Sequence, residues 1–272
     1  MNEILHIHSA SNNTLKRLRS LREKKYRQRE QLFMAEGLRI ATEALEAGWV
    51  PEILLYAEGK GDHLLVRRLV QATLDNRGQV LETTPDLLSG LTGKDNPQAV
   101  AAAYRPRHLT LGDIVPGPRT LVAERLRDPG NLGTLLRAAD ATAATAFLLV
   151  DACTDPTAPE AVRASMGAFF TVPAIMCTSG EFLAWKQEHG AHLVGAALDP
   201  RAQDYRKTSW PDKSLILLGN EQAGLPEELK SACDELVIIP MLGKADSLNV
   251  AMAGTVLLYA ALAAQQAPVR PE

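Results

Sequence analysis

IIPMLGKADSLNVAMAGTVLLYAAL, residues 238–262, runs from a β-branched strand through a loop with proline and glycine into a helix. From Val250 to Ala264 the helix is almost wholly apolar and rich in alanine, which predicts that it is buried and closely packed. A polar Ser-Leu-Asn opening on a buried helix is costly unless its polar groups find partners. Helix capping is the simplest interpretation of Ser247 and Asn249, because both residue types favour that position.

The length and charge of the chain set the first limits on its organisation. At 272 residues it exceeds the usual length of one domain, so two domains are expected. Its formal net charge is −3, but residues 16–30 alone hold eight basic and two acidic residues. This segment therefore has a net charge of +6, and the rest of the chain has a net charge of −9. This asymmetry indicates a face for a polyanion, although a solvated helix face would give the same pattern.

Several classes of protein are disfavoured by what the sequence lacks. Cys153, Cys177 and Cys233 are isolated and form no C-x-x-C pair, so neither a zinc site nor a disulfide framework is expected and no metal is indicated. The N-terminus does not have the order of a secretory signal, and no apolar run reaches the ~20 residues that span a bilayer. We therefore expect a cytoplasmic protein with no membrane contact.

Strands and helices alternate along the first part of the chain. Residues 12–29 predict a basic helix with leucines at every third position, and 1–30 are taken as an N-terminal extension. A small α/β domain follows over 31–105, with strands at 31–35, 52–56, 79–83 and 98–104 and helices at 38–47, 63–74 and 85–89. Residues 105–119 carry three prolines and two glycines, so 106–119 are the expected linker.

The second expected domain, residues 120–272, alternates again and its strands are continuously apolar. Such strands suit a parallel sheet covered on both faces. Strands are predicted at 120–124, 146–150, 172–176, 192–197, 215–218 and 236–239, with helices at 132–142, 158–166, 181–189 and 226–231. The fold class is therefore α/β in both halves.

Three junctions between strands and helices in the second half carry polar residues. The chain has no P-loop, no G-x-G-x-x-G after the first strand of either half and no G-x-S-x-G, so its ligand site is built differently. The three junctions are DPGNLGTLLRAAD (128–140, motif one), LLGNEQAGL (217–225, motif two) and the opening stretch (motif three). Asn131 is a natural N-cap, and the ends of parallel strands are where such folds bind ligands.

The three motifs, in this order, resemble those of the SpoU/TrmH family of ribose 2′-O-methyltransferases, part of the SPOUT superfamily. The resemblance covers about 120–264 and implies a C-terminal α/β domain tied in a trefoil knot. Phe33-Met34-Ala35-Glu36-Gly37 and the helix after it are similar to the N-terminal substrate-binding domain that many members carry. No metal or covalent intermediate is expected, since the methyl donor already carries a good leaving group.

The resemblance also assigns roles to individual residues. It implies S-adenosyl-L-methionine as cofactor, bound by Ala197, Leu198, Leu218, Gly219, Asn220, Ile239, Met241 and Leu248. It places the catalytic positions at Asn131, Arg137, Glu221, Ser247 and Asn249. Family members are typically homodimers, in which Asn131 and Arg137 of one subunit complete a site near the other subunit's cofactor.

RNA is the substrate that the resemblance implies, and ribosomal RNA is favoured over transfer RNA because minimal tRNA-modifying members tend to lack the extra domain. We expect the basic extension to grip the RNA backbone through Lys16, Arg17, Arg19, Arg22, Lys24, Lys25 and Arg27. The alternatives are a tRNA ribose 2′-O-methyltransferase and a non-catalytic RNA-binding protein that kept the knot.

Overall fold

The computed structural model describes residues 4–92 and 99–265 and divides into two compact units. Unit 1 comprises Met1–Arg107 and Thr157–Thr171, and unit 2 comprises His108–Pro156 and Val172–Glu272. The boundary at 107–108 falls within the proline-rich stretch in which a linker was expected. The units differ from the expected domains in two respects: residues 1–30 are part of unit 1, and so is a segment from the second half of the chain.

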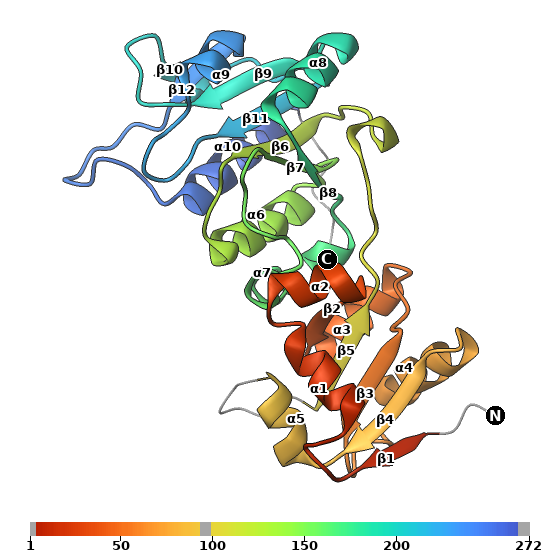
Figure 1. The fold of residues 1–272 in the computed structure, drawn as a ribbon. Coiled ribbons are helices and arrows are strands. Elements are labelled where there is room, and N and C mark those ends of the chain that lie inside the picture. Colours follow the sequence, from red (N-terminus) through yellow and green to blue (C-terminus); the bar gives the residue numbers. More distant parts are fainter. Residues whose placement is uncertain (1–3, 93–98, 266–272) are drawn as a thin grey trace. The chain divides into compact units, whose positions relative to one another are not determined.

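Unit 1 is built on a five-stranded sheet with the order β1-β4-β3-β5-β2 (Figure 1). β1, β4 and β3 are parallel, and β5 is antiparallel to both β3 and β2. The strands are Leu5–Ile7 (β1), Phe33–Glu36 (β2), Ile53–Ala57 (β3), Gln79–Thr83 (β4) and Val100–Tyr104 (β5). The helices are Asn13–Ser20 (α1), Lys24–Glu30 (α2), Leu38–Glu46 (α3), Leu64–Asp75 (α4) and Pro85–Thr92 (α5). Gln98, part of one predicted strand, lies outside the described residues.

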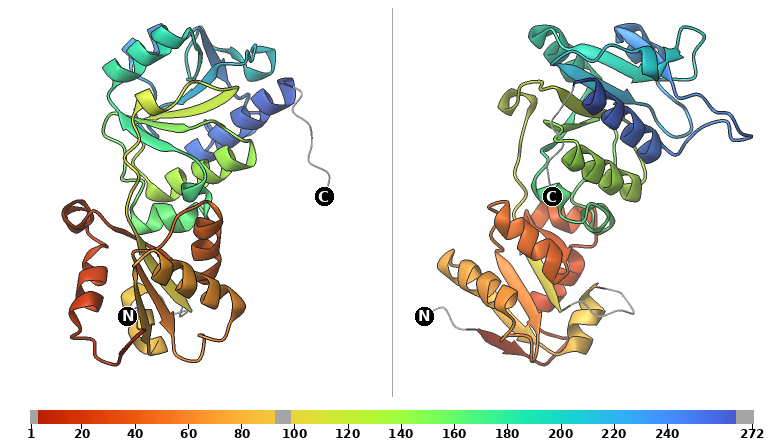
Figure 2. Two further views of the ribbon diagram at one scale, coloured as in Figure 1. Left: turned by 90° about the vertical axis from the view of Figure 1, so that its right-hand side faces the viewer. Right: turned by 180° about the vertical axis from the view of Figure 1, so that it is seen from behind.

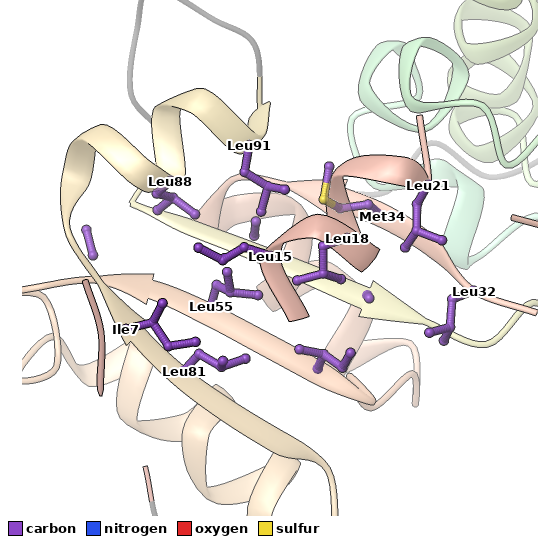
Figure 3. Packing of buried hydrophobic residues seen from close by; sticks show 14 residues of the cluster. Ile7, Leu15, Leu18, Leu21, Leu32, Met34, Leu55, Leu81, Leu88 and Leu91 are labelled. Atoms are coloured by element: carbon purple, nitrogen blue, oxygen red, sulfur yellow. The ribbon is translucent and has the colours of Figure 1, made fainter. Parts of the chain in front are cut away.

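Helices α1 and α5 cover one face of this sheet, while α3 and α4 cover the other (Figure 1). The leucines at every third position of the basic segment, Leu15, Leu18 and Leu21, are fully buried against the sheet (Figure 3). Burial of each leucine contributes about 1.5–3 kcal/mol. This apolar stripe explains why the N-terminal segment belongs to unit 1 instead of forming a separate extension.

The single basic helix predicted over 12–29 is in fact two helices, α1 and α2. Asn12 caps α1 with its side chain, and α1 ends at Ser20. Arg27 of α2 is buried, and its guanidinium donates hydrogen bonds to the carbonyls of Leu21 (2.9 Å) and Arg22 (2.8 Å). These bonds satisfy carbonyl groups that a continuous helix would have used internally.

The inserted segment 157–171 joins unit 1 through an aromatic cluster. It contains α7 (Pro159–Ala164) and the 3-10 turn η2 (Ala168–Phe170). Phe169 and Phe170 pack against Phe33, with ring centroids 5.0 and 6.0 Å away, and Trp49 Nε1 donates to the Phe170 carbonyl (3.0 Å). A hydrogen-bonded ion pair of Arg163 with the buried Glu36 (2.8 Å) adds a polar tie.

Unit 2 is a seven-stranded sheet with the order β10-β12-β9-β11-β6-β7-β8, and every pairing is parallel, as predicted. Its strands are Arg119–Glu124 (β6), Phe147–Val150 (β7), Ala174–Cys177 (β8), His192–Ala196 (β9), Gln203–Asp204 (β10), Ser214–Leu218 (β11) and Glu235–Ile238 (β12). Its helices are Pro129–Ala141 (α6), Ser179–His189 (α8), Glu227–Ala232 (α9) and Val250–Ala264 (α10), with 3-10 turns Leu111–Asp113 (η1) and Tyr205–Lys207 (η3).

Helices α6 and α10 lie side by side on one face of the unit 2 sheet, and α8 and α9 cover the other (Figure 2). Between β9 and α10 the chain moves outward to β10, back to β11, outward again to β12 and finally back over β6 and β11. This repeated crossing is what the expected trefoil knot requires, and the knot itself stays a prediction. It brings motifs one, two and three to the carboxyl ends of β6, β11 and β12.

Candidate active site

Asn249 is the N-cap of α10, as predicted, and it also makes a second contact. Its Oδ1 accepts hydrogen bonds from the backbone N–H groups of Ala251 (2.9 Å) and Met252 (3.4 Å). Its Nδ2 donates to Asn131 Oδ1 across 3.0 Å, which links motif three to motif one. Ser247 lies two residues before this cap and is exposed, and the N-cap position belongs to Asn249 alone.

Asn131 is not the N-cap of α6, contrary to the prediction. The helix starts earlier, with Asp128 as N-cap and Pro129 in the first turn, where its fixed φ is suited to a helix start. Asp128 Oδ1 accepts the backbone N–H of Asn131 (2.6 Å). The Asn131 side chain therefore contacts motifs two and three: its Oδ1 accepts from Asn249, and its Nδ2 donates to Glu221 Oε1 (3.4 Å).

Motif two forms a tight turn that is held by Asn220. Asn220 Oδ1 accepts from the backbone N–H groups of Gln222 and Ala223 (3.0 Å each), and its Nδ2 donates to the Arg125 carbonyl (2.9 Å). The turn thereby places the Glu221 carboxylate next to Asn131. Asn249, Asn131 and Glu221 form one hydrogen-bonded cluster, contributed by three segments far apart in the sequence.

A cavity of about 550 Å³, the main cavity, opens at the ends of β9 and β11. Ser247, Glu221 and Asn249 line it, and most of the predicted cofactor residues do so as well: Ala197, Leu198, Leu218, Gly219, Asn220 and Leu248. Ile239 and Met241 are half-buried and are not among its lining residues. Apolar side chains and a glycine backbone thus meet a polar rim.

A second cavity of about 440 Å³, the side cavity, lies on the other side of the cluster. Arg127, Asp128 and Asn131 line it, together with four residues that also line the main cavity: Asn220, Glu221, Gln222 and Asn249. Glu221 and Asn249 line both cavities and thus form part of the wall between them, while Asn131 faces the side cavity. Sequence reasoning missed Arg127, and the only signal was a basic residue directly before the motif-one Asp128.

Arg137 is exposed on α6 and lines neither cavity. It follows Asn131 by six residues, which corresponds to about 9 Å along the helix axis and about 240° of rotation. Within one chain the structure thus brings together Asn131, Glu221 and Asn249, with Ser247 nearby, but leaves Arg137 on another side of α6.

A buried carboxylate lies beside the turn of motif two. Glu124, at the end of β6, contacts the guanidinium of Arg125, whose carbonyl holds Asn220. Burial raises the pKa of the Glu124 carboxyl, and the hydrogen bond from Arg125 acts in the opposite direction. The hydrogen bond from Arg125 thus favours the ionised form of Glu124 and opposes the effect of burial.

The basic residues predicted to bind RNA have different surroundings. Arg17 is bonded to Glu30 (2.8 Å), Arg22 donates to the Leu91 carbonyl (2.5 Å), and Arg27 is buried between α1 and α2. Arg27 is therefore unable to reach a phosphate in this structure. Lys16, Lys24 and Lys25 are exposed, Arg19 is half-exposed, and Lys25 pairs with Glu23 (2.9 Å).

Comparison with known proteins identifies the family to which both parts of this chain are related. The model of the SpoU rRNA methylase family matches residues 118–259, and that of the MRM3-like substrate-binding domain matches 12–102. The chain belongs to the SpoU rRNA methylase family. It is thus a member of a class of S-adenosylmethionine-dependent RNA ribose 2′-O-methyltransferases, as the motifs predicted.

Relatives of this family match over nearly the whole chain. The chain is 30% identical over 254 residues to the 23S rRNA (guanosine(2553)-2′-O)-methyltransferase RlmP of Bacillus subtilis, covering 93% of this chain and 97% of that one. It is 32% identical to the 23S rRNA (uridine(2479)-2′-O)-methyltransferase of Streptomyces viridochromogenes, covering 85% and 82%. The AdoMet-bound rRNA methyltransferase of Sinorhizobium meliloti superimposes with a TM-score of 0.89 at 38% identity, covering 95% and 97%.

The main cavity suits the family cofactor. Leu218 and Leu248 offer apolar surface, and Gly219 leaves its backbone close to the opening. Its volume of about 550 Å³ is within the range of small-molecule sites. Within 4–92 and 99–265, no group of three or more His, Cys, Asp or Glu residues could hold a metal ion, and no helix is long and apolar enough to cross a membrane.

Proposed function

We propose that this enzyme methylates a ribose 2′-hydroxyl of ribosomal RNA, with the large-subunit (23S) RNA as the substrate. The observation that carries the proposal is the cluster of Asn131, Glu221 and Asn249, which separates a cavity suited to the cofactor from an open cavity lined by Arg127. The names of the relatives in Bacillus subtilis and Streptomyces viridochromogenes support 23S RNA.

S-adenosylmethionine supplies a methyl group on a sulfonium, which is a good leaving group. The chain has to place the ribose oxygen in line with that methyl and accept the hydroxyl proton. Asn131 is suited to placing the oxygen, because its amide orientation is fixed by Asn249. Its Nδ2 uses one hydrogen towards Glu221 and has a second to donate to the 2′-oxygen.

The proton has two possible acceptors near this position. Glu221 is a carboxylate on the wall between the cavities, and the substrate phosphate or water is the other acceptor. We favour the phosphate or water, with Arg137 holding that phosphate, because a guanidinium hardly deprotonates in proteins and binds phosphate in a planar, bidentate manner. Arg137→Lys keeps the positive charge but loses the planar guanidinium. If this variant retained near-normal turnover at pH 7, the role of Arg137 in holding the phosphate would be wrong.

A homodimer would supply the Arg137 that one chain leaves outside its own site. α10 has an apolar outer face, on which Met252 (61% exposed) and Tyr259 (48% exposed) stand seven residues apart and so on the same side. Pairing of this face with its counterpart would bring α6, and Arg137 on it, to a second subunit. We also place the enzyme in the cytoplasm, because its cysteines are free thiols.

The test is methyl transfer to protein-free 23S RNA, followed by mapping of 2′-O-methyl groups. The wild-type enzyme should introduce one such group, and Asn131→Ala should bind the cofactor normally by calorimetry yet lower turnover by about 10²-fold or more. Transfer to transfer RNA alone would overturn the choice of substrate. Cofactor binding without transfer to any RNA would leave a non-catalytic RNA-binding protein.

A further inference from the structure

Unit 1 contains a cavity of about 460 Å³ that the active site does not use. It lies where α3 and α4 end and β3 begins, and we call it the basic pocket. Its charged lining residues are Arg77, Arg105, Arg107 and Glu52, so three arginines face one carboxylate. Arg105 binds Glu52 with two of its nitrogens, which leaves the charges of Arg77 and Arg107 uncompensated by the lining.

Arg107 is held in a fixed orientation. Its guanidinium carbon lies 4.1 Å from the centroid of the Trp49 ring, and its Nη2 donates to the Gly48 carbonyl (2.9 Å). Trp49 is itself anchored by its bond to the Phe170 carbonyl and by the surrounding aromatic rings. A guanidinium has five N–H groups, and this arrangement uses one, so the others remain on an exposed side chain.

Arg77 occupies a backbone position that does not suit an arginine. It follows the end of α4 with φ of 60°, in the left-handed region where glycine or asparagine is preferred. Five other non-glycine residues of the described chain also have a positive φ, so the backbone of Arg77 alone does not mark a site, although such positions do occur at ligand clamps. A cation that merely neutralised the end of the helix would bond to its last carbonyls, but within the described residues no hydrogen bond or ion pair fixes the Arg77 side chain.

We propose that the basic pocket binds a backbone phosphate of the substrate RNA through Arg77 and Arg107. Planar guanidinium groups match phosphate oxygens in a bidentate manner, and a guanidinium that is already oriented loses less entropy on binding. This inference rests on the proposed function and adds to it an RNA contact in unit 1. It moves that contact away from Arg17, Arg22 and Arg27, which are engaged within the protein.

The experiment measures binding of protein-free 23S RNA to the full chain by filter binding, without cofactor, over a series of salt concentrations. The variants are Arg77→Asn and Arg107→Gln. Asparagine accepts the left-handed backbone, so Arg77→Asn should be at least as resistant to heat as the wild type, and weaker binding could not come from unfolding. Arg39→Gln is the control, because Arg39 is an exposed arginine of unit 1 that pairs with Glu43 and does not line the pocket.

Each pocket variant should bind about tenfold more weakly and lower the slope of log affinity against log salt by about 0.7–1. Arg39→Gln should change neither quantity. The proposal is overturned if Arg77→Asn keeps the wild-type affinity and slope, or if Arg39→Gln weakens binding equally. If no variant, and not even the wild type, transfers a methyl group, the proposed function fails, while the binding data still decide the role of the pocket.

Discussion

Replacement of Gly219 by alanine tests whether the turn of motif two fixes the active site. A Cβ atom at residue 219 would lie 2.5 Å from the carbonyl carbon of Gly224 and 2.6 Å from the backbone nitrogen of Leu225. Ordinary contact begins near 3.4 Å, so the two sides of the turn would have to separate by about 0.9 Å. Both obstacles are backbone atoms, which cannot move aside as the end of a side chain can.

The cost of this separation follows from the geometry. Extra atoms in a packed region typically cost 1–3 kcal/mol, and contact with backbone favours the upper end, about 3 kcal/mol. At about 2–4 °C per kcal/mol, the melting temperature should fall by roughly 6–12 °C. Because Gly219, Asn220 and Glu221 line the main cavity, the affinity for S-adenosylmethionine should also fall, by about tenfold or more.

Calorimetric titration with S-adenosylmethionine measures the affinity for the cofactor. The stability of unit 2 is followed by thermal melting, using the transition whose midpoint moves when the cofactor is added. Gly180→Ala is the matched control: residue 180 is in α8, a Cβ there would meet nothing within 4 Å, and alanine favours helix over glycine. The control should be as stable as the wild type or more so. If Gly219→Ala retained wild-type melting and affinity, the turn would be more pliable than these contacts imply.

Three further predictions concern a cap, a buried cation and the thiols. Asn249→Asp should keep α10 stable by thermal melting, because aspartate also caps, yet lower turnover by about 10²-fold since it cannot donate to Asn131. Arg27→Gln should cost about 1–3 kcal/mol in a chemical unfolding experiment, because two carbonyls between α1 and α2 lose their donor, and equal stability would refute that role. Burial raises the pKa of the Cys153 thiol to about 11 and those of Cys177 and Cys233 to about 12. Alkylation of these thiols at pH 8 should therefore be slow unless urea is added. Since only the unfolded chain releases these protons near pH 8.5, stability should fall as the pH rises above that value, and a flat profile between pH 8 and 10 would contradict the shifts.

The sheet of unit 2 was largely predictable because most of its strands are short, apolar and followed by a helix, a pattern that favours a covered parallel sheet. Three features of the fold were not predictable. β10 has two residues, too few to show a period, and the break between α1 and α2 depends on bonds from Arg27 that periodicity does not record. The attachment of 157–171 to unit 1 depends on Phe169 and Phe170 meeting aromatic residues more than a hundred positions away.

The motifs name the residues of the candidate site, whose catalytic roles stay a prediction, but they do not give its arrangement. The motifs identified Asn131, Glu221 and Asn249, whereas their hydrogen bonds join positions 90 and 118 residues apart in sequence. The spacing of motif one suggested that Asn131 was a cap, because asparagine and aspartate compete for that position and only the structure shows that Asp128 occupies it. Arg127 and the basic pocket carry no motif at all, since a single arginine in a sequence says nothing of the cavity it lines.

The cap of α10 also determines the direction of the hydrogen bonds in the active site. The N–H groups of Ala251 and Met252 need an acceptor, so the oxygen of the Asn249 amide must face the helix and its nitrogen must face Asn131. Asn131 then has to present its oxygen to Asn249 and its nitrogen to Glu221. A donor is thereby fixed at the wall between the two cavities, where the proposed reaction would need one for the ribose oxygen. Under the proposed mechanism, capping and catalysis would be one role for Asn249, since the helix start would supply the orientation that the reaction uses.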